Sequence, residues 1–157
     1  MNDTLSQTLL EVVNSGAPGA TVSPEGTKVN VATGLVVTIT CANFEAEAAP
    51  AAIREFVDTY AKVAKAHGLL FGVFRLPSGR YSVDLNILRP ESDRERVAEF
   101  AHANNQHSYF DARAGACIET GLSGEFGPKV ASPDAALVVA ALFTRTAFPV
   151  STVVRRW

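Results

Sequence analysis

The sequence is poor in the features that mark several protein classes. It has two cysteines, Cys41 and Cys117, in 157 residues and no C-x-x-C spacing. We therefore expect buried free thiols instead of a disulfide framework or a structural zinc site. No apolar run approaches the roughly 18 residues of a membrane-spanning helix. The net charge of −2 gives no electrostatic basis for binding nucleic acid or an anionic membrane.

Targeting and catalytic motifs are also missing. Residues 1–10 contain Asp3 and no basic region, so we expect no secretory signal and a cytoplasmic protein. There is no H-E-x-x-H, no G-x-S-x-G and no paired H-x-T. His102 and His107 could bracket a catalytic site, with Asp84 or Asp111 orienting an imidazole, but no nucleophile accompanies them. We expect a protein that is not an enzyme and has no cofactor and no metal.

The sequence does contain alternating helix and strand patterns, which predict one α+β domain over residues 1–157. We expect a small, mostly antiparallel sheet packed against two or three helices. Residues 122–157 are expected to complete this domain or to form a C-terminal extension or oligomerisation element, and 133–147 suits a helix or a strand. Helices are predicted at 4–13, 50–67 and 92–103, and strands at 20–23, 28–31, 35–41, 69–76, 80–88, 107–111 and 116–119.

Two of these strands alternate in polarity. In 80–88 one face is apolar, so we expect it to pack on helices while the polar face meets solvent or ligand. The apolar face holds Tyr81, Val83, Leu85 and Ile87, and the other face holds Arg80, Ser82, Asp84 and Asn86. In 35–41 the same pattern predicts one dry face with Val37, Ile39 and Cys41 and one mixed face with Val36, Thr38 and Thr40.

Residues 104–111, NNQHSYFD, combine amide, imidazole, hydroxyl, aromatic and carboxylate groups. Asn105 and Gln106 can read a base edge or a ribose hydroxyl. Tyr109 or Phe110 can stack on a purine, and Asp111 can accept hydrogen bonds from ribose. The alternative is structural: Asn104 or Asn105 ends a helix in the left-handed conformation, Gln106 satisfies a backbone group and Phe110 is core. Because Tyr109 and Phe110 point to opposite faces of a strand, one of the two rings is expected in the core. For a phosphate, the candidate ligands are Arg75, Arg80 and Arg113.

Three motifs carry a resemblance to a known family. FGVF at 71–74, YSVD at 81–84 and NQHSYFD at 105–111 occur in an order that resembles small phage-encoded anti-defence proteins. The resemblance is to the first family of Thoeris anti-defence proteins and covers residues 68–121. The chain departs from that pattern in its tail after Gly121 and at His107.

The resemblance implies a sponge that sequesters a cyclic ADP-ribose or cyclic nucleotide immune signal without cleaving it. It also implies a homo-oligomer with ligand near subunit interfaces, in the host cytoplasm. The ligand-binding candidates are Arg75, Asn105, Gln106, Tyr109, Phe110, Asp111 and Arg113. Two alternatives remain: a phage structural or protein–protein interaction domain without a small ligand, and a cyclic nucleotide hydrolase that uses His102 or His107.

Overall fold

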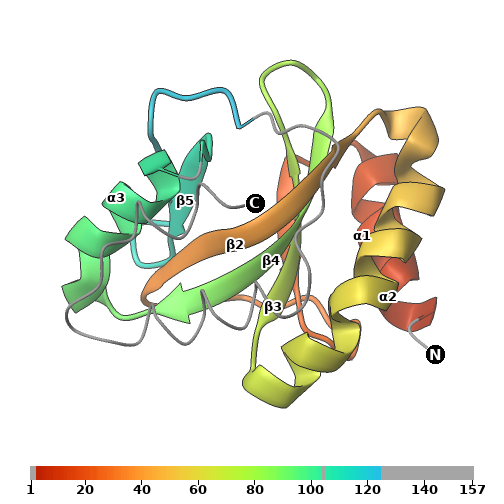
Figure 1. Cartoon of the computed structure of the whole chain (residues 1–157), viewed down its shortest axis with the longest axis horizontal. Helices are drawn as coiled ribbons and strands as arrows, with labels where there is room; N and C mark the ends of the chain where they lie inside the picture. Colours follow the sequence, from red (N-terminus) through yellow and green to blue (C-terminus); the bar gives the residue numbers. More distant parts are fainter. Residues whose placement is uncertain (1–2, 104, 125–157) are drawn as a thin grey trace.

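The computed structural model describes residues 3–103 and 105–124, and these form three α-helices and a curled six-stranded antiparallel sheet (Figure 1). The predicted α+β class is confirmed. The helices are α1 (Asp3–Ser15), α2 (Ala49–His67) and α3 (Arg94–Ala103). The strands are β1 (Gly19–Val22), β2 (Leu35–Phe44), β3 (Leu70–Arg75), β4 (Tyr81–Arg89), β5 (Ser108–Asp111) and β6 (Ala116–Glu119). Short 3-10 turns, Ala46–Ala48 and Glu91–Asp93, precede α2 and α3.

Most predicted elements are present within a few residues of their expected limits. The exception is 28–31, where an isolated bridge between Lys28 and Val22 replaces the predicted strand. The predicted helix limits hold best for α2, because Pro50 needs no amide partner in the first turn. Gly68 ends this helix with φ 66°, a left-handed conformation that glycine adopts without strain. The ambiguous segment 133–147 lies outside the described residues.

The sheet order is β1-β3-β4-β2-β5-β6, with every neighbouring pair antiparallel. In Figure 1, α1 and α2 lie side by side along one side of the sheet, and α3 lies next to β2 and β5. The core is between these helices and the sheet. Its largest fully buried side chains include Phe56 and Tyr60 of α2, Phe71 of β3, Leu85 of β4 and Phe100 of α3.

The alternation of apolar and polar residues along β4 separates a core face from a polar face, as predicted. Val83 and Leu85 are fully buried in the core, on the face that the helices cover. Ser82, Asp84 and Asn86 point to the opposite face, yet each is also less than a tenth exposed. A buried polar face is unusual, because each group must find a hydrogen-bond partner away from water.

A bulge in β2 overturns the prediction for the end of that strand, whereas Val37 and Ile39 lie in the core and Val36 and Thr38 on the opposite face as predicted. The pairing of β2 with β4 shifts register between Thr38 and Thr40, which leaves Ile39 as an extra residue. Before the bulge Thr38 pairs with Asn86 on the polar face, and after it Cys41 pairs with Asp84 on the same face. Cys41 therefore lies opposite the face predicted for it, while Thr40 turns toward the helices.

Candidate functional site

A cavity of about 330 Å³ lies on the sheet face away from the helices. Strands β2, β3 and β4 supply its floor, and residues 29–31 and 106–110 supply its walls. Its lining combines apolar residues with polar side chains from the floor and from both walls. The lining residues with polar side chains include Thr21, Asn30, Thr38, Ser82, Asp84, Asn86, Gln106, His107 and Ser108.

Two hydrogen bonds order the polar floor. The Thr38 hydroxyl donates to Asn86 Oδ1 at 2.9 Å, and the Ser82 hydroxyl donates to Asp84 Oδ1 at 2.5 Å. Each bond holds one of the two polar atoms at the end of the accepting side chain, Asn86 Oδ1 in the first bond and Asp84 Oδ1 in the second. The second atoms, Asn86 Nδ2 and Asp84 Oδ2, both lie above Gly72 of the neighbouring strand.

Gly72 is the position that gives these two atoms room. A β-carbon placed there would be 2.6 Å from Asn86 Nδ2 and 3.6 Å from Asp84 Oδ2. The first distance is far inside van der Waals contact, so any other residue would displace the Asn86 amide. The absence of a side chain at this point therefore maintains the floor of the cavity.

Asp84 has the strongest electrostatic perturbation in the floor. Burial raises the pKa of its carboxyl to about 7, and the hydrogen bond from Ser82 opposes only part of that rise. Near neutral pH this group can therefore donate or accept a hydrogen bond. The adjacent Cys41 thiol has its pKa raised, first by burial and then by the Asp84 charge. Cys41 is consequently a protonated, unreactive thiol.

The wall formed by 106–110 contributes buried polar groups. Gln106 is 7% exposed, and its amide lies beside the Cys41 thiol, to which it can donate a weak hydrogen bond. His107 Nδ1 is enclosed by the protein without a hydrogen-bond partner. The His107 ring stacks on Phe74 of β3, with centroids 5.8 Å apart. This wall thus combines polar side chains with a ring face.

Three of the predicted ligand-binding residues contribute atoms to the cavity lining, Gln106, Tyr109 and Phe110. Phe110 pairs with Val36, so its ring is on the cavity face, whereas Tyr109 alternates to the helix-covered face and joins the core. Asn105 has φ 50°, and the amide of Gln106 bonds to the Ala101 carbonyl. This is the left-handed helix end that the structural alternative predicted for Asn104 or Asn105.

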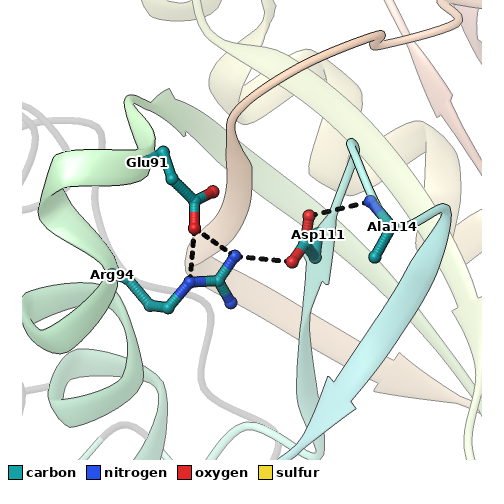
Figure 2. A network of polar contacts seen from close by, with 4 residues as sticks. All are labelled: Glu91, Arg94, Asp111 and Ala114. Atoms are coloured by element: carbon teal, nitrogen blue, oxygen red, sulfur yellow. Dashed lines mark hydrogen bonds and ion pairs between the residues drawn. The ribbon is translucent and has the colours of Figure 1, made fainter.

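The predicted residues Arg75 and Arg113 are not part of the lining, and both are exposed. Asp111 serves another contact, shown in Figure 2. Its Oδ2 accepts a 2.5 Å bond from Arg94 of α3, and its Oδ1 accepts the Ala114 amide at 3.1 Å. These bonds hold the pKa of Asp111 below its ordinary value, with the backbone amide as the largest cause. Asp111 therefore fixes β5 against α3.

The floor residues of β2 and β4 were not among the predicted ligand-binding residues. The polar alternation of 80–88 was the available signal for Ser82, Asp84 and Asn86. His102 is exposed at the end of α3 and does not line the cavity. Cys117 corrects another expectation, because it is a free but exposed thiol at the cavity edge.

No family model, curated protein or solved structure matches this chain. Over the described residues, no three His, Cys, Asp or Glu side chains gather as a metal-binding group. The helices in that part of the chain include none that is long and apolar enough to cross a membrane.

Proposed function

We propose that this protein binds a small polar ligand in the cavity on the polar face of the sheet and releases it unchanged. The observation that carries the proposal is the cavity itself, in which the buried polar floor of Asp84 and Asn86 meets the Gln106 amide of the wall. Buried polar groups need hydrogen-bond partners, and leaving one without a partner costs about 1–3 kcal/mol. A ligand that exchanges hydrogen bonds with this floor would supply such partners.

The rest of the cavity supports the same function. Its volume of about 330 Å³ is at the lower end of ligand pockets, which hold roughly 300–1,000 Å³. An apolar lining with a few converging polar groups is the usual composition of such sites. The polar floor is ordered by its own hydrogen bonds, which lowers the entropy lost when a ligand binds.

Binding without turnover is supported by the chemistry of the lining. Of the described lining residues, Asp84 is the sole carboxylate and His107 the sole imidazole. The nearby Cys41 is held as a protonated thiol and offers no nucleophile, so the one accessible thiol of the described lining is Cys117 at the cavity edge. The specific form we propose, from the motif resemblance, is sequestration of a cyclic ADP-ribose or cyclic nucleotide immune signal by a phage-type anti-defence protein.

The test is a depletion and release assay. The protein is mixed with cyclic ADP-ribose isomers and cyclic nucleotides, separated from free ligand, heat-denatured, and the released ligand is identified by mass spectrometry. We expect depletion followed by recovery of intact ligand. Gln106→Leu should weaken depletion at least tenfold, whereas Lys62→Ala, on the exposed surface of α2, should not. Absence of depletion for every ligand contradicts the proposal and favours a protein–protein interaction domain.

A hydrolase is the second candidate, because His107 and Asp84 line one cavity. It predicts degraded ligand after denaturation. In that case His107→Ala should retain depletion and abolish degradation, while His102→Ala should leave both unchanged. Arg75→Ala and Arg113→Ala test the predicted phosphate contacts separately, since neither side chain lines the described cavity.

A further inference from the structure

The charge of the cavity lining restricts the ligand, provided that the proposed function holds. Among the described lining residues there is no lysine or arginine, and the one ionisable acid is Asp84. Arg80 is directed elsewhere, because its Nε lies 3.1 Å from Glu45 Oε1. A phosphate in this cavity would lose its water beside a carboxylate, with no cation to compensate.

The hydrogen-bonding groups of the cavity are of mixed type. Asn86 Nδ2 is a donor, Asp84 Oδ2 is an acceptor when ionised, and the Gln106 amide of the wall has both a donor and an acceptor atom. Side-chain amides and carboxylates in this combination match the donor and acceptor edge of a nucleobase. The Phe110 ring and the stacked Phe74 and His107 rings add apolar faces on which a flat heterocycle can stack.

We infer that the cavity recognises the nucleobase part of its ligand and takes an uncharged nucleoside in preference to a phosphorylated one. The site consists of Asn86 and Asp84 on the floor and Gln106 on the wall. Phosphates of a larger ligand would have to lie outside the described lining. Nothing in the motif resemblance carries this preference, which follows from the charges and atoms of the lining.

The experiment compares matched pairs by isothermal titration calorimetry at pH 8. Adenosine, guanosine, cytidine and uridine are each compared with their 3′,5′-cyclic monophosphates, which add one fixed negative charge. We expect at least one nucleoside to bind tenfold or more tightly than its cyclic monophosphate. Asp84→Asn should reduce that preference at least threefold, because it removes the repelling charge. Asp58→Asn, the same change on the exposed surface of α2, should not.

Three results would overturn the inference: nucleosides that all bind less than tenfold more tightly than their cyclic monophosphates, no binding by any nucleoside, or an unchanged preference in a folded Asp84→Asn protein. If Asp84→Asn does not fold, the comparison of each nucleoside with its cyclic monophosphate on the wild-type protein still tests the inference. Depletion of cyclic ADP-ribose or a cyclic nucleotide without nucleoside binding refutes the base preference and leaves the proposed function standing. If the protein neither depletes a cyclic ligand nor binds a nucleoside, the base preference and the proposed function are both refuted.

Discussion

Asp84→Asn should remove a pH dependence from the stability of this protein. The carboxyl has a pKa of about 7 when folded, against an ordinary value of 3.8. Between these two values the folded protein holds a proton that the unfolded chain releases. Stability from this proton is therefore fully present below about pH 4 and is lost as the pH rises to about 7.

The size of the loss follows from the two pKa values. Each pKa unit corresponds to about 1.4 kcal/mol, so the interval from 3.8 to about 7 corresponds to about 4 kcal/mol. Small domains have total stabilities of about 5–15 kcal/mol, so the effect is readily measured. The asparagine amide is nearly isosteric and can accept the Ser82 hydroxyl as the carboxylate does, while carrying no charge at any pH.

The assay is urea unfolding, followed by circular dichroism, at intervals from pH 4 to pH 8. The free energy of unfolding of the wild type minus that of Asp84→Asn should fall across this range and then level off. Other titrating groups are common to both proteins and cancel in the difference. Asp58→Asn, an exposed control, should give a flat difference. A flat difference for Asp84→Asn as well would mean that the carboxyl is not buried as described.

Three further outcomes are expected. Gly72→Ala should displace the Asn86 amide, lowering the stability by about 1–3 kcal/mol in urea unfolding and weakening nucleoside binding at least tenfold. Arg94→Ala should lower the melting temperature at pH 7 by leaving the Asp111 carboxylate without its guanidinium. The loss should shrink as the pH falls below 3.8, because Asp111, whose folded pKa lies lower still, then becomes protonated. A thiol reagent should label Cys117 alone in the native protein and both thiols after denaturation, and bound ligand should slow the native reaction.

The local sequence pattern was sufficient to predict the helices, all but one of the strands, and the two faces of β4. The alternation from Tyr81 to Ile87 correctly separated the core side from the polar side, since side-chain direction in a regular strand depends only on position. The same reasoning failed in β2, where one extra residue at Ile39 reverses the alternation. No feature of the sequence 35–41 marks that bulge, which is defined by pairing with a strand more than forty residues away.

The site was predicted less well because it is assembled by long-range pairing. Residues 104–111 were identified as a recognition segment, and Gln106 and Phe110 do line the cavity. The partner of Asp111 could not be read from the segment, because Arg94 is on the preceding helix and is brought close by the turn between them. The floor of the cavity depends on β3, β4 and β2 being neighbours in the sheet.

The alternation of β4 also bears on how such a protein can change. Odd-numbered positions 83, 85 and 87 hold the fold together, and even-numbered positions 82, 84 and 86 meet the ligand cavity. Substitutions at the even positions can alter what is bound while leaving the hydrophobic packing on the other face intact. Under the proposed function, β4 keeps core packing and ligand contacts on separate faces, so positions 82 and 86 are a natural place for selection or directed evolution to change specificity, while Asp84 also determines the pH dependence of stability.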